Sequence, residues 1–315
     1  MRHEAGNRVE QEQIGRVLTK GSQTEPDEVS SASSKALPLV LFIATVFTTL
    51  WAGAYQTDTS PLRGAWRFLM EEPAALLRGI PFAGTLMGIL VTHELGHYVL
   101  SRIHRVPASF PLFIPGPPHF IGTFGAIIRM RGPILGRKAL FDIGVAGPIA
   151  GFVVAVVALV IGLSLSKVVS IDRAYGLHLG EPLLLQFVSW LVLGPIPQGS
   201  DVVLHPVGFA AWFGLFVTSL NLIPLGQLDG GHVAYALWGD RQRQIAMAVV
   251  PTLIVLGLVG WHGWFVWAGL AGIVGFTHPP VSDPEAVLGR ARVWVGWAAF
   301  LIFVLTFAPI PFSFG

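Results

Sequence analysis

The run PFAGTLMGILVTHELGHYVLS, residues 81–101, is both a candidate membrane span and a candidate functional site. It is long enough to cross a bilayer as one helix, which takes ~20 residues. Within this apolar run lie two imidazoles and a carboxylate, on His93, Glu94 and His97. Ionisable groups inside a span are costly, so each marks a functional site by default. The run therefore predicts a membrane helix that carries chemistry near its C-terminal end.

The composition of the whole chain agrees with a membrane protein. Of 315 residues, 53% are hydrophobic and 12% are charged, and the mean hydropathy is +0.65. Soluble domains carry about 25% charged residues, so a wholly disordered chain is excluded and a soluble enzyme is not expected. The net charge of +2 is too small to indicate a nucleic-acid partner. Cysteine is absent, so a zinc site must use His, Asp, Glu or water.

Seven apolar stretches predict an all-α polytopic membrane protein with six or seven transmembrane helices. The count stays open because two short stretches flank Gly260-Trp261-His262-Gly263 and are either two helices or one re-entrant feature. The seven stretches are 36–55, 81–101, 139–163, 207–228, 245–260, 262–276 and 293–311. Two amphipathic segments, 64–80 and 182–193, are expected to lie in the membrane interface.

Residues 1–35 differ from everything that follows them. They contain five Lys or Arg, six Asp or Glu and a Ser-rich end, a composition that cannot bury enough apolar surface to order itself. We expect a flexible polar tail over 1–35 and a transmembrane domain over 36–315.

Basic residues in the loops predict the orientation in the membrane. The loop 102–138 carries six Lys or Arg and no acidic residue. Cytosolic loops are enriched in these cations, so this loop and the N-terminal tail are expected in the cytosol. His93 and His97 are near the end of their span that leads into this loop, so they are expected toward the cytosolic side.

The motif His93-Glu94-Leu95-Gly96-His97 has the spacing of a zinc site. On a helix, positions i and i+4 share one face about 6 Å apart along the axis, so two imidazoles can bind one tetrahedral zinc. Glu94 follows His93 by about 100° around the helix and lies beside the metal. There it can take a proton from zinc-bound water and return it to the leaving amine. The alternative to a zinc site is a polar contact between helices, without a metal.

A third ligand is expected from the run NLIPLGQLDGGH, residues 221–232. Zinc needs a third protein ligand and an open position for water, and Asp229 is the candidate. Pro224, Gly226, Gly230 and Gly231 are expected to unwind the helix here, which is tolerated at membrane depth only where the backbone lines a protein site. In the predicted topology, Asp229 and the two histidines share the cytosolic ends of their spans.

Other polar residues have competing interpretations. Asp142 is a rival carboxylate ligand, but beside Arg137 and Lys138 a solvated or paired group is the expected role. His232 is expected just outside the metal or at the mouth of the site. Asn221 is either an interhelical hydrogen-bonding group or a donor to substrate or to the developing oxyanion, and the residues alone leave both open.

Taken together, HELGH (93–97) and NLIPLGQLDGGH (221–232) resemble the site-2 protease family of intramembrane zinc metalloproteases. The family pattern is H-E-x-x-H on one span and Asn-x-x-Pro followed by Leu-Asp-Gly on a later one. The segments 122–126 and 141–151 resemble the branch with chloroplast and bacterial members. The resemblance implies zinc ligands His93, His97 and Asp229, with Glu94 as general base. It also implies a substrate-orienting role for Asn221.

Two further segments fit such an enzyme. Residues 120–130, FIGTFGAIIRM, have β-type composition and are expected to form a strand or hairpin whose edge captures extended substrate, or else an apolar re-entrant loop. Gly147 and Gly151 form G-x-x-x-G, which permits close approach of helices. Many family members carry a PDZ domain between the two motifs, and the segment 164–206 is too short for one.

The sequence thus predicts an intramembrane metalloprotease with one Zn²⁺ per chain. Its partners are expected to be the lipid bilayer and a single-pass membrane-protein substrate, cut within or near its transmembrane segment. We expect a multi-pass protein of a prokaryotic cell membrane. The alternatives are a polytopic zinc carrier, with a path open to both faces, and an inactive homologue that binds membrane proteins.

Overall fold

The computed structural model describes residues 30–56, 70–71, 73–130, 136–170, 177–279 and 281–314. The chain divides into two compact units, Met1–Leu37 and Pro38–Gly315. Apart from the first residues of the first helix, Ser30–Leu37, the elements discussed below all belong to the second unit. Most of the predicted tail 1–35 lies outside the described residues, and the first described helix begins within it, at Ser30.

The described elements are mostly helices, and the strands among them form three small antiparallel pairs. In chain order they are α2 (Ser30–Gln56), η1 (Pro73–Gly79), α4 (Ile80–Ile103), β1 (Leu112–Pro115), β2 (Thr123–Ile127), α5 (Arg137–Ser164), β3 (Lys167–Ser170), β4 (Leu177–Leu179), α6 (Leu183–Leu193), β5 (Ser200–Val203), α7 (Pro206–Asn221), α8 (Asp229–Trp238), α9 (Arg241–Val259), α10 (Gly263–Val274), α11 (Gly289–Thr306) and β6 (Phe312–Phe314).

The described residues contain five helices that are long and apolar enough to cross a membrane. They are Ala36–Gln56 of α2, Pro73–Ile103, and α5, α9 and α11. Three shorter apolar helices, α6, α7 and the α10 segment Gly263–Ile273, accompany them. The predicted polytopic architecture is therefore confirmed. The expected span 207–228 is shorter than predicted, because α7 ends at Asn221.

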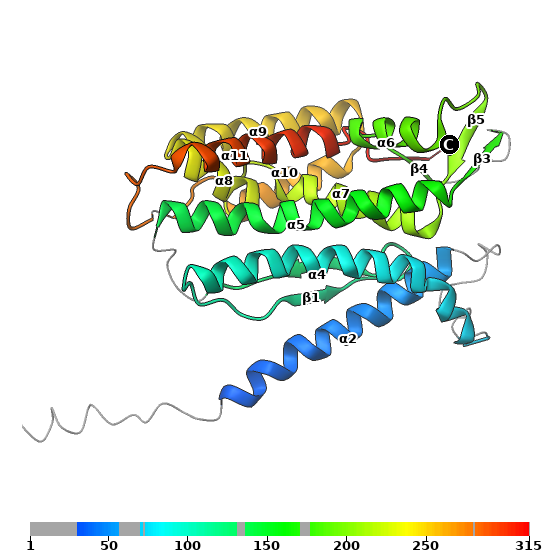
Figure 1. Cartoon of the computed structure of the whole chain (residues 1–315), viewed down its shortest axis with the longest axis horizontal. Helices are drawn as coiled ribbons and strands as arrows, with labels where there is room; N and C mark the ends of the chain where they lie inside the picture. Colours follow the sequence, from blue (N-terminus) through cyan, green and yellow to red (C-terminus); the bar gives the residue numbers. More distant parts are fainter. Residues whose placement is uncertain are drawn as a thin grey trace, which may run out of the picture. The chain divides into compact units, whose positions relative to one another are not determined.

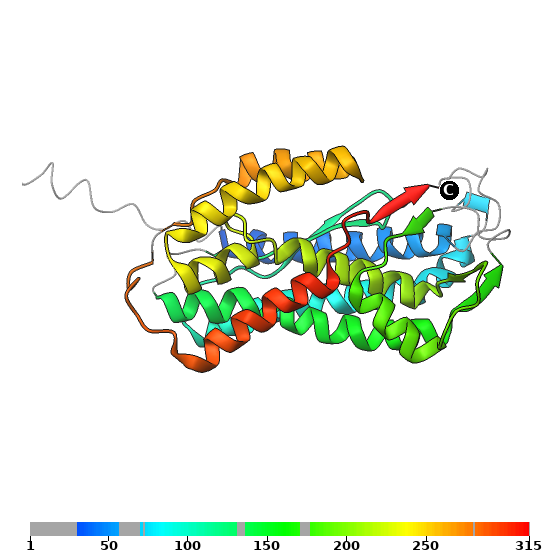
Figure 2. The same cartoon turned by 90° about the horizontal axis from the view of Figure 1, so that it is seen from above.

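The helix α5 lies at the centre of the bundle. It packs against α4 on one side and against α7, α8 and α11 on the other (Figure 1). Seen from above, α11 crosses α5 and α7 obliquely (Figure 2). At the α5–α7 contact a Cβ on Gly162 would collide with the backbone of Gly208, so glycine at this crossing allows the two helices to touch. The HELGH motif of residues 93–97 on α4 is thus held against α5, the most central helix.

Two predictions about local structure are settled by the described elements. The segment 120–130 contains β2, which pairs antiparallel with β1, so the predicted hairpin is confirmed. The stretches either side of Trp261 form two helices, α9 and α10, that contact each other. The segment 182–193 forms the short helix α6. Of the segment 64–80, residues 64–69 and 72 lie outside the described residues and η1 covers most of the rest.

Candidate metal centre

Two turns of α4 carry the paired imidazoles. His93 and His97 lie one helical turn apart, and their Nε2 atoms are 3.1 Å from each other. Both side chains are largely buried, with 6% and 12% of their surface exposed. The predicted i, i+4 pairing on one helix face is what the structure shows.

The third group comes from the junction between α7 and α8. The chain leaves α7 at Asn221, turns through 222–228, and begins α8 at Asp229. Gly226 adopts a positive φ of +49° in this turn, a conformation that favours glycine. A Cβ on Gly230 would collide with the Leu222 carbonyl, so the first turn of α8 folds back closely on the end of α7. The predicted break in this helix is confirmed, although Gly230 and Gly231 belong to α8 and not to the unwound part.

This turn places Asp229 beside both imidazoles. Its Oδ2 lies 3.3 Å from His93 Nε2 and 3.2 Å from His97 Nε2. All three ligand atoms lie within 4.8 Å of one another, as a metal-binding group requires. A tetrahedral zinc with bonds of about 2.0–2.1 Å separates its ligand atoms by roughly 3.3 Å. The spacing and the chemistry of the three donors therefore fit one zinc ion.

The backbone of α5 orients one of the two histidines. His97 Nδ1 lies 2.7 Å from the carbonyl oxygen of Ile143. A carbonyl can only accept, so Nδ1 carries the proton and Nε2 keeps its lone pair toward Asp229 and His93. Such a contact behind a ligand fixes both the tautomer and the orientation of the ring.

The G-x-x-x-G of α5 provides the space in which these rings lie. A Cβ on Gly147 would collide with the imidazole of His97, and a Cβ on Gly151 would come within 3.1 Å of His93 Cβ. In turn, a Cβ on Gly96 would lie 2.6 Å from the Ala146 carbonyl oxygen. The spacing predicted close helix approach, and the structure adds that the approach is to the histidines themselves.

Glu94 and Asn221 complete this group. Glu94 follows His93 directly on α4 and is buried, with 6% of its surface exposed. Asn221, the last residue of α7, has its Nδ2 atom 3.3 Å from His93 Nε2. The five residues singled out from the sequence are therefore brought together.

Asp142, the rival carboxylate, is engaged elsewhere. Both of its oxygens accept from Arg292 of α11 at 2.8 Å, and Oδ2 also lies 2.9 Å from His104 Nε2. The expectation of a paired group is correct, but the cation is Arg292 and not Arg137 or Lys138. This cluster joins the end of α4 to α5 and α11.

His232 is more buried than a residue at the mouth of a site. It is 8% exposed, and its Nδ1 lies 2.7 Å from Nε2 of His278. The ring of His278 stacks on Tyr235, with centroids 4.5 Å apart. Burial lowers the pKa of His232 to about 4, aided by the neighbouring His278. Burial also lowers the pKa of His278, so both rings are neutral at pH 7.

Comparison with known proteins agrees with the geometry. The sequence profile of peptidase family M50 matches residues 81–259, which include the HELGH motif, Asn221 and Asp229. The chain belongs to peptidase family M50. The resemblance to site-2 proteases seen in the two motifs is thereby confirmed.

Relatives of this M50 chain include named plant proteins. It is 28% identical over 239 residues to "Probable zinc metalloprotease EGY2, chloroplastic" of Arabidopsis thaliana, covering 75% of this chain and 43% of the relative. It is 32% identical over 246 residues to "Probable zinc metalloprotease EGY1, chloroplastic" of Oryza sativa subsp. japonica, covering 71% and 41%. The chain therefore spans less than half the length of these curated relatives. No solved structure matches it significantly.

The relatives also bear on the expected location. Multiple apolar helices and membership of M50 make this a multi-pass membrane protein. The printed names place the relatives in chloroplasts, which does not support the expectation of a prokaryotic membrane.

Sequence reasoning missed several contributors to the M50 site. The Ile143 carbonyl is a backbone group and leaves no side-chain pattern to read. Arg292 lies 150 residues from its partner Asp142, beyond any local spacing rule. His278 lies in the loop before α11, and the structure pairs it with His232, 46 residues earlier in the chain. Gly147 and Gly151 differ from these contributors, because their G-x-x-x-G spacing predicted the close approach of helices.

Proposed function

We propose that this chain is an intramembrane zinc metallopeptidase that hydrolyses a peptide bond of a single-pass membrane protein within or near its transmembrane segment. The observation that carries the proposal is the convergence of His93, His97 and Asp229, whose ligand atoms lie within 4.8 Å of one another. The match to family M50 and the names of its relatives support the same chemistry.

His93, His97 and Asp229 would hold the zinc ion, with the His97 ring oriented by the Ile143 carbonyl. A zinc ion in this position would polarise the scissile carbonyl and acidify a water molecule. Glu94 would take the proton of the attacking water, whose oxygen bonds to the carbonyl carbon. Glu94 would then return that proton to the amine nitrogen as the C–N bond breaks. The amide of Asn221 would donate to the carbonyl oxygen and orient it.

The β1–β2 hairpin supports a role in substrate binding. It is a two-stranded sheet, so among the described residues each strand has one edge without a strand partner. β2 contacts α4, the helix that carries the metal motif. Proteases bind their substrates in extended form, and an unpaired edge captures an extended chain through its backbone. A transmembrane helix would unwind locally to pair there.

The site lies toward the end of α4 that leads into the basic loop 102–138. The basic charge of that loop supports a cytosolic location for this end of the bundle. Water would then reach the buried group from the cytosolic side.

The Glu94→Gln variant tests the proposal. The change keeps size and hydrogen bonding but removes the base, so we expect cleavage of a model single-pass substrate to fall by at least ~10²-fold. Zinc content of the purified protein, measured by mass spectrometry, should not change. Glu285→Gln, an exposed glutamate in the loop before α11, is the matched control.

The same variant separates the alternatives. Cleavage by Glu94→Gln at the wild-type rate contradicts the assigned base. Zinc flux into vesicles by both proteins, without cleavage by either, supports the carrier. Zinc binding with neither flux nor cleavage supports an inactive, substrate-binding homologue.

A further inference from the structure

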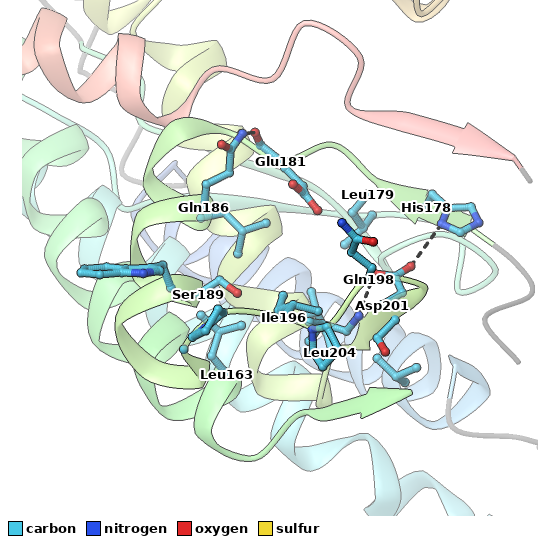
Figure 3. A pocket seen from close by; sticks show the side chains of 18 of the residues that line it. Leu163, His178, Leu179, Glu181, Gln186, Ser189, Ile196, Gln198, Asp201 and Leu204 are labelled. Atoms are coloured by element: carbon cyan, nitrogen blue, oxygen red, sulfur yellow. Dashed lines mark hydrogen bonds and ion pairs between the residues drawn. The ribbon is translucent and has the colours of Figure 1, made fainter. Parts of the chain in front are cut away.

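A cavity of about 800 Å³ lies at the other end of the helices that build the metal centre (Figure 3). Its lining includes Leu163 near the end of α5 and Phe209 near the start of α7. Leu163 follows Gly147 by 16 residues and Phe209 precedes Asn221 by 12, which correspond to about 24 Å and 18 Å of helix. The cavity and the metal group are thus joined by two helices but well separated.

The lining of this cavity is acidic. Among the described residues, its lining contains the carboxylates of Glu181 and Asp201 and no Lys or Arg. Asp201 is turned toward His178, with Oδ2 3.6 Å from Nδ1 (Figure 3). No described residue forms an ion pair with Glu181, whose side chain points into the cavity. A carboxylate of this kind favours a cationic side chain.

The cavity is also bordered by unpaired strand edges. All four residues of β5 line it, as do His178 and Leu179 of β4. β5 pairs only with β3 and β4 only with β6 among the described strands, so each keeps one edge free. Free edges bind extended peptide through backbone hydrogen bonds, and neighbouring pockets then select side chains.

The helix that forms one wall of the cavity has an apolar outer face. On α6, Leu183, Phe187, Trp190 and Leu191 are each more than half exposed. A short helix with such a face is typical of a segment lying on a membrane interface. The cavity is therefore positioned to meet a chain as it emerges from the bilayer.

We propose that this cavity binds the extramembrane flank of the substrate, as an extended segment that carries a Lys or Arg side chain against Glu181. The proposal rests on the proposed function, because it assumes a single-pass substrate cut at the metal centre. A distance of about 18–24 Å corresponds to 12–16 helical residues or about six to seven extended ones. That is a suitable spacing between a cut inside the span and a flank outside it.

The test uses two model single-pass substrates that differ only in their non-cytosolic flank, Thr-Val-Lys-Val-Thr or Thr-Val-Gln-Val-Thr. Each is cleaved by the full-length protein in lipid nanodiscs, and KM and kcat are measured separately. We expect the lysine substrate to have a KM about two- to fivefold lower with unchanged kcat, because Glu181 is exposed and solvent screens its contact with the lysine. Glu181→Gln should remove this difference, and Glu181→Asp should restore part of it. Glu285→Gln is the control that should leave it intact.

Other outcomes overturn the proposal. Equal KM values for the two substrates with the wild-type protein would show that the cavity does not recognise the lysine charge of the flank. A Glu181→Gln protein that loses kcat equally for both substrates would show that the carboxylate supports the fold instead. Failure of the proposed function is seen separately, because the wild-type protein would then cleave neither substrate.

Discussion

The two ends of this bundle each bring a histidine and an aspartate together, but in different surroundings. At the metal end, His97 and Asp229 lie 3.2 Å apart with 12% and 17% of their side chains exposed. At the cavity end, His178 and Asp201 lie 3.6 Å apart and are 39% and 38% exposed. The first pair is set on helices and fixed by close glycine contacts, while the second is set on short strands. Metal chemistry needs fixed ligand positions, whereas a surface that recognises a flexible chain does not.

Among substitutions in α5, the largest expected effect comes from filling the space beside His97. We expect Gly147→Ala to displace the imidazole, because the added Cβ would collide with it. A misplacement of about 1 Å at a reacting centre can cost ~10²-fold in rate, so cleavage should fall by at least that factor. Zinc affinity, measured by competition with a chelator, should fall as well.

Gly88→Ala on α4 is the matched control for this change. A Cβ at Gly88 meets nothing within 4 Å, and alanine is favoured over glycine in a helix. Full activity of Gly147→Ala would contradict the positioning role assigned to the α5 glycines.

The next effect concerns the cluster that joins the metal helix to its neighbours. Asp142→Asn removes the charge that Arg292 and His104 share, one residue before the carbonyl that orients His97. We expect a loss of about 1–2 kcal/mol in unfolding free energy. This is less than the ~3–5 kcal/mol of a fully buried pair, because Arg292 is 37% exposed and solvent screens it. Cleavage should fall about tenfold.

A double-mutant cycle with Arg292→Gln isolates the pair. If the two residues act through each other, the second substitution should cost much less than it does alone. Additive losses in thermal stability would show instead that Arg292 and Asp142 contribute independently.

The same residues show how much of the site could be predicted from the sequence. HELGH and the Asp229 run are local patterns in apolar surroundings, so the grouping of His93, His97 and Asp229 and the break after Asn221 could be predicted. The hairpin followed from the β-type composition of 120–130. Arg292 and the Ile143 carbonyl could not be found, because their contacts depend on how α5, α4 and α11 pack. The cavity depends on the approach of separate strand pairs, which no local spacing encodes.

A smaller effect is expected from the paired histidines beside the metal centre. Burial lowers the pKa of His278 below its ordinary value near 6.5. The unfolded chain therefore binds more protons than the folded one below that pH, and stability falls as the pH falls. Between pH 7 and pH 5.5 we therefore expect the wild-type protein to lose stability through this group.

His278→Gln should reduce this loss, measured by thermal unfolding at several pH values. The exposed His262→Gln is the control and should keep the wild-type pH dependence. An unchanged pH dependence in His278→Gln would show that the ring does not control acid stability.

The smallest effect is expected at the cavity end, for the half-exposed pair of His178 and Asp201. Solvent screens His178 and Asp201, and exposed ion pairs contribute about 0–1 kcal/mol. We therefore expect Asp201→Asn to change the unfolding free energy by less than about 1 kcal/mol, with zinc content unaffected. Asp229→Asn, the same chemical change at the other end, should remove zinc, because the donor it alters lies within 3.3 Å of both imidazoles. A loss of zinc from Asp201→Asn would mean that the two ends are coupled through α5 and α7. Equal, small effects of both substitutions would mean that Asp229 is not a ligand.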